Sequence, residues 1–511
     1  MIAPPPRSPS RRHVLLGSLA MAGAACRAGT APAIMKGEID PREFGATGGD
    51  PEADTRAWNL AVAAAAERGR PILARGTYVI RMATEPSWDY QNRPGNPVYV
   101  AVRMRSGVSV YGRDAEFLQA PLLVPPPPET LEPKKRRGPK PARARYIMFG
   151  TGLNPKTGSL RDIHFEGLRF DFRDEIGPVG GGSFAFGMTG VENLRRHDIM
   201  IRSTGARAGR GLHGENLTNR VDTSIRHENI QQGIHTLYER GVSMTDISFD
   251  GFNEALDFNG PCWDVTLKRL RFRKAAREGQ CVDTGGGARW LIDGVDAQDT
   301  GAVVYVYAKP LAWPTYGEWL AAQGAPTSDW VPPSDMTVRN VVASGINVAP
   351  GSRQHESARI GSLRSKKWRR ANPDGGPSPR NIAFERWSLR NCAPIFVGDC
   401  DGFALRDLTI ADAVAPQRGH LDGAISVLRS PDGSGGAMAG TISGVRIASP
   451  AGRALSVDAG SGVTVEDVAV TGSAMGEDAV RIESPDGCAT PRVGRVSVDG
   501  RPVRATLPPG C

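Results

Sequence analysis

The feature that most constrains the fold is a three-residue pattern that returns five times in the middle of the chain. Each copy has a small or β-branched residue, then an aliphatic one, then a polar one. The polar residues are separated by 22, 22, 26 and 22 positions, with Gly, Asn and Asp between the copies. Short strands at such a period predict a solenoid, in which each turn of chain stacks on the previous one. The copies are Gly211-Leu212-His213, Gly233-Ile234-His235, Ala255-Leu256-Asp257, Cys281-Val282-Asp283 and Val303-Val304-Tyr305.

Stacking of these copies would bring their polar residues into one column. Successive side chains of a strand point to opposite faces, so the aliphatic residues would point inward and the next residue outward. The outward column is His213, His235, Asp257, Asp283 and Tyr305, and Asn347 of Gly345-Ile346-Asn347 is expected to continue it. A second outward set lies two positions further on: Glu215, Leu237, Asn259, Gly285 and Tyr307. Six rungs spaced roughly 4.8 Å apart would give a polar face roughly 25 Å long.

Composition agrees with a chain of many short strands and turns. The 511 residues include 62 glycines, only 6% are aromatic, and 40% are hydrophobic. A solenoid adds rungs without an upper size limit, so this length does not by itself indicate several compact domains. The mean hydropathy of −0.31 is typical of a soluble protein with enough apolar residues for a long core.

The N-terminus has the features of an export signal. Ser10-Arg11-Arg12 begins a twin-arginine pattern, and an apolar stretch follows that is too short to span a bilayer. Ala31-Pro32-Ala33 offers a cleavage site, so we expect residues 1–33 to be removed. The predicted location is periplasmic or secreted, with no integral membrane segment in the mature protein. A lipid anchor on Cys26 is disfavoured, because Gly23 stands where a lipobox normally has Leu.

Six cysteines remain after the signal, a number that permits disulfides in an exported chain. Pairing of sequence neighbours would give Cys262–Cys281, Cys392–Cys400 and Cys488–Cys511. The alternative is buried free thiols. The spacings do not resemble a zinc site, and we predict no structural metal.

The opening of the mature chain contains a helix flanked by a loop and a strand. Glu43-Phe44-Gly45-Ala46-Thr47-Gly48-Gly49 precedes Asp54, the expected N-cap of a helix from about Thr55 to Arg68. Gly69 ends this helix, and the segment from Ile72 to Ile80 is predicted to form a strand, a turn and a second strand.

These residues resemble the opening of pectate-lyase-superfamily proteins of the rhamnogalacturonase and epimerase type. Phe44-Gly45-Ala46, Asp54-Thr55, the Ala-rich helix and Gly76-Thr77-Tyr78 match the pattern, whereas Glu43 replaces an Asp and Ala74-Arg75-Gly76 replaces P-x-G. The resemblance implies an all-β chain: a right-handed parallel β-helix with an N-terminal capping helix and inserted loops. It does not identify a substrate, because this fold has several functions. We expect the cap and first rungs at 34–106 and the β-helix at 107–511.

Three insertions are expected, near 121–146, 309–334 and 350–379. The first and third contain basic clusters, at 134–145 and 364–370, which would attract a polyanion or would simply be solvated. Export makes nucleic acid a poor partner and an acidic polysaccharide a better one. The second insertion offers Trp313, Tyr316, Trp319 and Trp330, which would either stack on sugar rings or pack the insertion together.

Two carboxylates in adjacent rungs have the chemistry that glycoside cleavage needs. Asp257 and Asp283 would lie roughly 5 Å apart, and charge repulsion would raise the pKa of one of them. The pair would then contain a proton donor and an ionised partner. This separation suits a retaining hydrolase, and an intervening water would allow inversion. His235 would tune Asp257 or carry a proton, and His213 is the fourth catalytic candidate. The alternative is a structural ladder of Asp side chains or a calcium site.

Seven further residues are candidates for contact with the substrate. They lie on the outward face, at the start of the second insertion or close to the column in sequence: Tyr305, Tyr307, Asn259, Lys309, Glu215, Arg289 and Trp313.

Three functions are compatible with these residues. The first is an exported glycoside hydrolase that cleaves an acidic polysaccharide with Asp257 and Asp283 and needs no cofactor. The second is a polysaccharide lyase or uronate epimerase, in which His235, Lys309 or Arg289 would act as base or cation and the two Asp residues would hold calcium. The third is a non-catalytic carbohydrate-binding surface protein. A nucleotide cofactor is not predicted, because the glycine-rich turns lack a dinucleotide fingerprint.

Overall fold

The computed structural model of the protein describes most of the chain after the expected signal. Residues 37–89, 97–122, 144–152, 159–173, 182–205, 207–308, 327–348, 356–361, 378–416, 421–428, 437–459, 462–483 and 491–503 are described. The chain divides into two units, Met1–Glu38 and Ile39–Cys511, and the second unit carries the regular structure. The predicted signal at 1–33 lies outside the described residues. In the described part, no helix is long and apolar enough to cross a membrane.

Strands dominate the second unit, and one α-helix precedes them. In chain order the elements are the 3-10 helix η1 (Pro41–Phe44), α1 (Pro51–Arg68), β1 (Ile72–Ile80), β2 (Trp88–Asp89), β3 (Pro97–Arg103), β4 (Ser109–Gln119), β5 (Arg145–Gly150), β6 (Leu160–Asp171), β7 (Gly182–Arg202), β8 (Ala208–Phe258), β9 (Cys262–Thr284), β10 (Gly287–Gln298), β11 (Val304–Val306), η3 (Thr327–Asp329), β12 (Ser334–Ile346), β13 (Ala358–Ile360), β14 (Arg380–Cys392), β15 (Ile395–Val397), β16 (Cys400–Ala411), β17 (Ile425–Val427), β18 (Ala437–Ala448), β19 (Leu455–Asp458), β20 (Val463–Thr471), η4 (Gly476–Ala479), β21 (Val480–Glu483), β22 (Arg492–Val493), β23 (Val496–Val498) and β24 (Arg501–Pro502).

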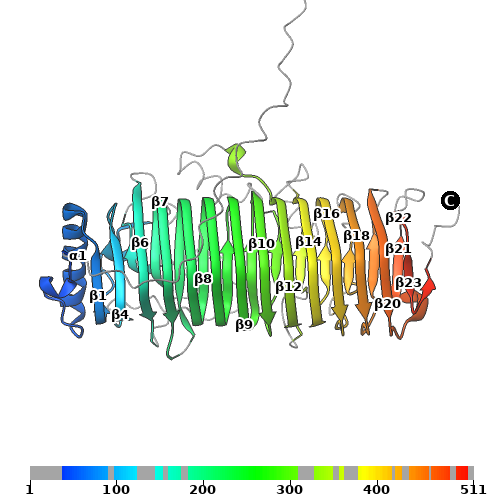
Figure 1. Cartoon of the computed structure of the whole chain (residues 1–511), viewed down its shortest axis with the longest axis horizontal. Helices are drawn as coiled ribbons and strands as arrows, with labels where there is room; N and C mark the ends of the chain where they lie inside the picture. Colours follow the sequence, from blue (N-terminus) through cyan, green and yellow to red (C-terminus); the bar gives the residue numbers. More distant parts are fainter. Residues whose placement is uncertain are drawn as a thin grey trace, which may run out of the picture. The chain divides into compact units, whose positions relative to one another are not determined.

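The strands stack in parallel, each on the equivalent strand of the previous turn. β4 pairs with β6, β6 with β7, and β7 with β8, and the same parallel order continues through β9, β10 and β12 (Figure 1). A second stack runs through β11, β13, β15, β17 and β19. The fold predicted from the sequence, a right-handed parallel β-helix with an N-terminal capping helix, is therefore confirmed.

Helix α1 covers the first rung, and a buried carboxylate fixes the loop before it. The N-cap is Asp50 rather than the predicted Asp54, because Pro51 starts the helix one turn earlier than expected. The Asp54 side chain is fully buried and accepts hydrogen bonds from the backbone N–H groups of Thr47 at 2.6 Å and Val79 at 2.8 Å. It thus joins the loop, the helix and β1. Strand β1 is continuous, and Gly76 (φ 67°) produces a register shift where a turn was expected.

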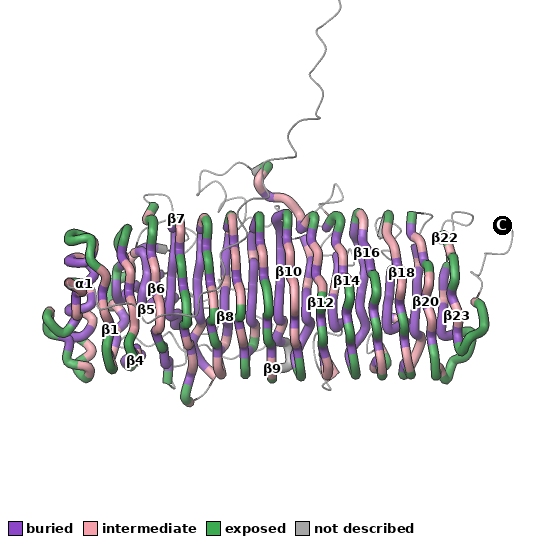
Figure 2. The backbone as a smooth tube through the Cα atoms, in the orientation of Figure 1, coloured by how far each residue is buried: buried purple, intermediate pink, exposed green. Residues whose placement is uncertain are grey.

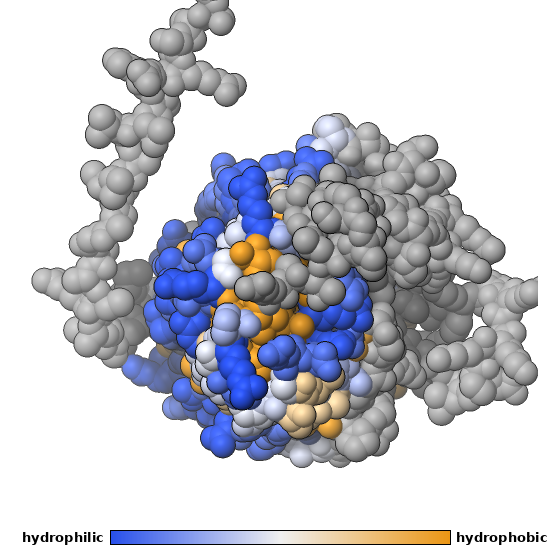
Figure 3. Space-filling view, turned by 90° about the vertical axis from the view of Figure 1, so that its right-hand side faces the viewer, coloured by the Kyte–Doolittle hydropathy of each residue, from blue (hydrophilic) through white to orange (hydrophobic). Residues whose placement is uncertain are grey.

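The core is a continuous apolar column along the inside of the β-helix. The buried stretches of the strands alternate with exposed ones in Figure 2. In Figure 3, which shows the C-terminal end, apolar side chains gather in the middle and hydrophilic ones surround them. At the N-terminal end, Trp58 of α1 packs edge-on against Tyr78, Phe117 and Phe149. Burial of these aromatic rings stabilises this end.

Four charged side chains interrupt the apolar core. Arg196 makes two hydrogen bonds to Asp222, at 2.8 and 2.7 Å, and Arg220 bridges Asp222 and Glu239. All four side chains are fully buried. Because an unpaired buried charge is strongly unfavourable, the group persists only as a complete set of partners.

The described cysteines are free thiols. Cys262, Cys281, Cys392 and Cys400 are all buried, so the expected pairs Cys262–Cys281 and Cys392–Cys400 are wrong. Each sulfur instead lies close to a local oxygen, as Cys281 does to the Thr300 hydroxyl at 3.4 Å. Burial raises the pKa of the Cys281 thiol to about 12, which keeps it protonated and unreactive. Cys26, Cys488 and Cys511 lie outside the described residues.

Candidate functional site

The predicted column forms, and the rungs stack in the expected register. Asp257 pairs with Asp283, and Asp283 with Tyr305. The imidazole rings of His213 and His235 stack with their centroids 5.4 Å apart. The aliphatic residue that precedes each polar one is fully buried in the core. The polar residues therefore project on the outer side of the solenoid, as the alternation predicts.

Beyond Tyr305 the column continues with Arg359, and the prediction for Asn347 is wrong. Arg359 of β13 pairs with Tyr305 of β11. Asn347 follows β12, which belongs to the other stack: Ile346 pairs with Cys392. The reason is that the polar step lengthens from 22 to 54 residues at this point, because the expected insertion at 309–334 and strand β12 lie between Tyr305 and Arg359. Arg359 itself lies in 350–379, a stretch that was expected to be an insertion and that contains β13. Phe396 follows Arg359, and Ser426, Ser456 and Arg481 then occupy the same column, in the rungs that the sequence indicated.

A second row of polar side chains lies alongside the column, and sequence reasoning missed it. Its members are Arg210, Gln232 and Glu254, which share the 22-residue step. The Gln232 amide reaches both rows: Nε2 donates to Glu254 Oε2 at 2.6 Å and to Asp257 Oδ2 at 3.3 Å. The two rows therefore converge at Gln232, and the strip of polar side chains that they form along the solenoid is called the groove below.

The corner between the two rows requires small residues. Two successive residues, such as Ala255 and Leu256, are both fully buried there, and their neighbours Glu254 and Asp257 both contact Gln232. A Cβ atom on Gly233 would lie 2.0 Å from Cε1 of the Phe249 ring. The small first residue of the sequence pattern is thus explained by packing of the corner against the core.

Three carboxylates meet in the groove. Glu254, Asp257 and Asp283 each place an oxygen within 4.8 Å of the others, and the two Asp residues are only 4% and 5% exposed. Asp257 Oδ2 also accepts a hydrogen bond from Asn259 Nδ2 at 3.3 Å and lies 3.6 Å from His235 Nε2. The Tyr307 hydroxyl donates to Asp283 Oδ2 at 3.3 Å. The structure thus brings five sequence-predicted residues together and adds Glu254 and Gln232.

The two histidines differ in their access to the groove. His235 is half-buried, and Asn259 Nδ2 lies 3.1 Å from its Nε2. His213 is fully buried behind it and contacts Glu215 Oε1 at 3.1 Å. Burial, with further contributions from Arg145 and Arg210, holds the pKa of His213 well below its usual range. His213 is therefore neutral at physiological pH and is shielded from a ligand in the groove.

An aromatic and cationic group follows the carboxylates. The Arg359 guanidinium lies 5.0 Å from the ring centres of both Tyr305 and Phe396 and hydrogen-bonds to the Tyr305 hydroxyl. Its Nη1 is 3.6 Å from Glu356 Oε1. Burial raises the pKa of Tyr305, so the phenol stays protonated. Stacking of this kind fixes the plane of the guanidinium.

Several predicted site residues lie elsewhere or outside the described chain. Arg289 lies at the corner where β10 begins, and its guanidinium makes two hydrogen bonds to Asp264, at 2.6 and 2.7 Å. Trp330 is 7% exposed and packs in an outer apolar cluster with Leu237, so it does not offer a ring to a sugar. Lys309, Trp313, Tyr316, Trp319 and the basic cluster at 364–370 lie outside the described residues. Of the basic residues at 134–145 only Arg145 is described, and it is buried.

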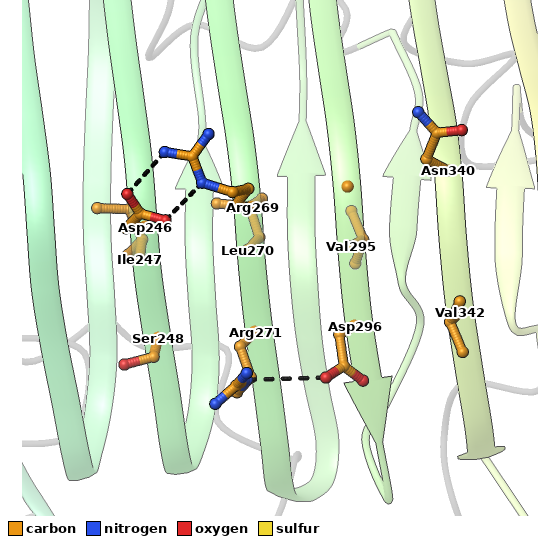
Figure 4. A pocket seen from close by; sticks show the side chains of 11 residues that line it. Asp246, Ile247, Ser248, Arg269, Leu270, Arg271, Val295, Asp296, Asn340 and Val342 are labelled. Carbon is orange, nitrogen blue, oxygen red and sulfur yellow. Dashed lines mark hydrogen bonds and ion pairs between the residues drawn. The ribbon is translucent and has the colours of Figure 1, made fainter. Parts of the chain in front are cut away.

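A concavity of about 770 Å³ lies along β8, β9, β10 and β12 (Figure 4). Its charged side chains are joined in pairs, Asp246 with Arg269 and Arg271 with Asp296. Val342 contributes an exposed apolar side chain. Because its acids are engaged by arginines, it offers no pair of carboxylates for catalysis, and we place the candidate site in the groove.

The three carboxylates could also hold a cation. Oxygen donors suit calcium, and three carboxylates within reach of one another would supply part of its coordination shell. Amide hydrogens of Gln232 and Asn259, however, point at Glu254 Oε2 and Asp257 Oδ2. These hydrogens would compete with a cation for the same oxygens.

Solved structures of polysaccharide-modifying enzymes and phage tailspikes are similar to this chain in fold. The A-module of the mannuronan C-5 epimerase AlgE6 from Azotobacter vinelandii is 12% identical and matches 92% of this chain and 100% of its own, with a TM-score of 0.45. A family 28 exopolygalacturonase from Yersinia enterocolitica is 11% identical over 91% and 78%, with a TM-score of 0.42. The tailspike of Escherichia coli bacteriophage HK620 is 11% identical over 91% and 78%, with a TM-score of 0.44. No protein-family model and no curated protein sequence matches the chain.

Proposed function

We propose that the protein is an enzyme that hydrolyses glycosidic bonds of a polysaccharide in this groove. The observation that carries the proposal is the meeting of Asp257 and Asp283, in adjacent rungs, with Glu254. Glycoside hydrolysis needs one carboxyl group to protonate the leaving oxygen and one carboxylate to activate water or attack the sugar. Carboxyl groups so close together cannot all be ionised at little cost, which favours one protonated member.

The environments of the two Asp residues suggest how these roles divide. Asp257 Oδ2 accepts from two amide groups, those of Gln232 and Asn259, and such donors favour the ionised form. Asp283 accepts a hydrogen bond from the phenol of Tyr307, a weaker donor arrangement than the two amides at Asp257. We therefore assign Asp257 as the base or nucleophile and Asp283 as the acid. His235, beside Asp257, would shuttle its proton.

We further propose that the polysaccharide is acidic and that Arg359 binds a carboxylate on it. Arg359 lies two rungs beyond Asp283, roughly 10 Å away along the groove, where it stacks on Tyr305 and Phe396 and its Nε donates to the Gly361 carbonyl oxygen at 2.9 Å. A planar guanidinium binds carboxylates with two parallel hydrogen bonds. The basic clusters at 134–145 and 364–370 would add long-range attraction.

The experiment is an assay of purified protein on neutral and uronate-containing polymers. New reducing ends without an ultraviolet-absorbing unsaturated end are expected on the uronate polymers, because hydrolysis adds water where a lyase eliminates. Proton NMR of the first product distinguishes retention from inversion. An unsaturated product would contradict the hydrolase.

A lyase or epimerase is the second candidate. It is favoured by the spacing of Glu254, Asp257 and Asp283, whose oxygens lie close enough together to bind one cation. In this case the three residues would hold calcium, which would stabilise the enolate formed when the proton next to a carboxylate is removed, and His235 would be the base. Activity measured with and without a chelator distinguishes the two candidates. Loss of activity with chelator and recovery with calcium would support the lyase or epimerase. Binding to the polymers without any product would instead support a non-catalytic carbohydrate-binding protein.

A further inference from the structure

A continuous chain of hydrogen bonds runs along one wall of the groove over three successive rungs. Arg210 Nη1 donates to Gln232 Oε1 at 3.0 Å. Gln232 Nε2 donates in turn to Glu254 Oε2 at 2.6 Å and to Asp257 Oδ2 at 3.3 Å. One neutral amide thus connects a cation with two of the three carboxylates.

The direction of the Gln232 amide is determined by its neighbours. Its carbonyl oxygen faces the guanidinium and its NH₂ group faces the carboxylates. The reverse orientation would place the NH₂ group against Arg210 and the carbonyl against two anions, so both contacts would become repulsive. Gln232 is 4% exposed, and water therefore compensates poorly for such a reversal.

Arg210 is itself held by contacts at the entrance to this chain. Its guanidinium lies 5.4 Å from the centre of the Phe184 ring, which belongs to the previous rung. The same ring packs against the His213 imidazole at 5.4 Å. The Arg210 side chain is therefore held in place by the Phe184 ring as well as by its hydrogen bond to the Gln232 carbonyl.

We propose that Gln232 is a positioning residue, which holds Glu254 and Asp257 in the orientation needed for reaction, and that Arg210 acts through it. The inference rests on the proposed function of Asp257. Gln232 donates one hydrogen bond to each of two carboxylates that lie on either side of the corner in the next rung, so it fixes their separation. Asp283 lies outside this chain of bonds, and its carboxyl is held by Tyr307 instead. The hydrogen bonds from Arg210 through Gln232, called the relay below, thus act on Asp257 and not on Asp283.

The activity test uses Gln232→Met, Arg210→Met and the double variant. Met has nearly the size of Gln and cannot donate a hydrogen bond. We expect Gln232→Met to lower kcat about 10- to 100-fold with KM little changed, because small misplacements of reacting groups have effects of this size. If Arg210 acts through Gln232, the double variant will be no worse than Gln232→Met alone. If the losses in kcat of the two single variants instead multiply in the double variant, the relay would be overturned.

Gln231→Met is the matched control. Gln231 is the preceding residue of β8, is half-buried, and makes no side-chain hydrogen bond with the described part of the chain. Neighbouring residues of a strand point to opposite faces, so this variant changes the same chemistry without touching the relay. Its kcat is expected to equal that of the unmodified protein.

A second measurement is independent of activity. In protein with ¹⁵N-labelled glutamine, the Gln232 NH₂ resonances, assigned by their loss in Gln232→Met, are expected to show slow solvent exchange. Arg210→Met should shift them and speed their exchange. Unshifted resonances would overturn the relay even if the protein is active. A shift in a protein that cleaves no polymer would leave the relay standing and refute the proposed function.

Discussion

Two groups of charged side chains in this protein have different surroundings. Inside the solenoid, Arg196, Arg220, Asp222 and Glu239 are paired with one another and sealed from solvent. In the groove, Asp257 receives hydrogen bonds from the neutral amides of Gln232 and Asn259. A carboxylate held by neutral donors remains able to accept a proton or attack a substrate, whereas one paired with arginine does not. This difference is why we place the chemistry at Asp257.

Substitution of Arg359 tests recognition of an acidic substrate. Arg359→Met should raise KM for a uronate polymer about 10-fold, with kcat little changed, because a bidentate charge-assisted contact two rungs from the carboxylates would be lost. Steady-state kinetics on the polymer provide the measurement. Arg406→Met, at an exposed pair with Glu385, is the control and should have no effect. An unchanged KM in Arg359→Met would show that the acid is recognised elsewhere.

A buried histidine should make stability depend on pH. His227 is fully buried and stacked on Phe249 with ring centres 4.3 Å apart, and burial lowers its pKa to about 3. In the unfolded chain the histidine has an ordinary pKa near 6.5. Between pH 6.5 and pH 3 the unfolded chain therefore binds a proton that the folded protein does not bind. Stability is therefore complete above about pH 6.5 and falls toward pH 3, by about 1.4 kcal/mol per pH unit below 6.5.

The variant His227→Phe should lose this dependence. The difference between unfolding midpoints in urea at pH 7 and pH 5 should be smaller for His227→Phe than for the unmodified protein. His197→Phe, on the surface, is the control and should keep the full difference. An equal difference in both variants would mean that His227 does not resist protonation.

At the scale of the strand, the corner between the two polar rows determines the geometry of the groove. Gly233→Ala would place a Cβ atom 2.0 Å from Cε1 of Phe249 and 2.7 Å from the Ala255 carbonyl oxygen. Overpacking of this kind costs about 1–3 kcal/mol and should displace the rung that carries His235. Thermal unfolding and activity should both decline. Gly49→Ala, where a Cβ atom meets nothing within 4 Å, should leave both unchanged.

Sequence periodicity predicted the elements well where the chain keeps a constant step. His213, His235, Asp257 and Asp283 stack as expected, because each rung between them closes within 22 to 26 residues. Asn347 was wrongly assigned because it follows β12, which belongs to the other stack. Arg359 was missed because β13 lies within 350–379, a stretch that was expected to be an insertion. The sequence alone does not show how many residues an insertion adds before the chain returns to the column.

The second polar row was missed for a different reason. Strict alternation places Glu254 on the same side as Leu256, inside the solenoid. The structure has a corner at which Ala255 and Leu256 are both buried, and this reverses the parity, so that Glu254 and Asp257 converge on Gln232. Such a corner depends on packing against the opposite strands, as the contact of Gly233 with Phe249 shows. The pairing of cysteines failed similarly, because strand register and not sequence distance sets which side chains meet.

At the scale of the whole molecule, the residues that stabilise the solenoid are separate from the residues of the candidate site. The apolar core runs through the described rungs, and helix α1 covers its first one (Figure 1). The outer column changes along the same axis: buried histidine, then carboxylates, then Tyr305 and Arg359, then Ser426 and Ser456. A chain-like ligand lying along this axis would meet the carboxylates near the middle of its length, which suits a polymer substrate.

The most direct test of the proposed function is the rate at which new reducing ends form on a uronate polymer, compared among the unmodified protein, Asp257→Asn and Asp283→Asn. Both substitutions preserve side-chain shape and remove a group that transfers a proton or attacks the sugar, so each should lower kcat by about 10²–10⁴-fold with the fold intact. Full activity in both variants would contradict the assignment of catalysis to this groove.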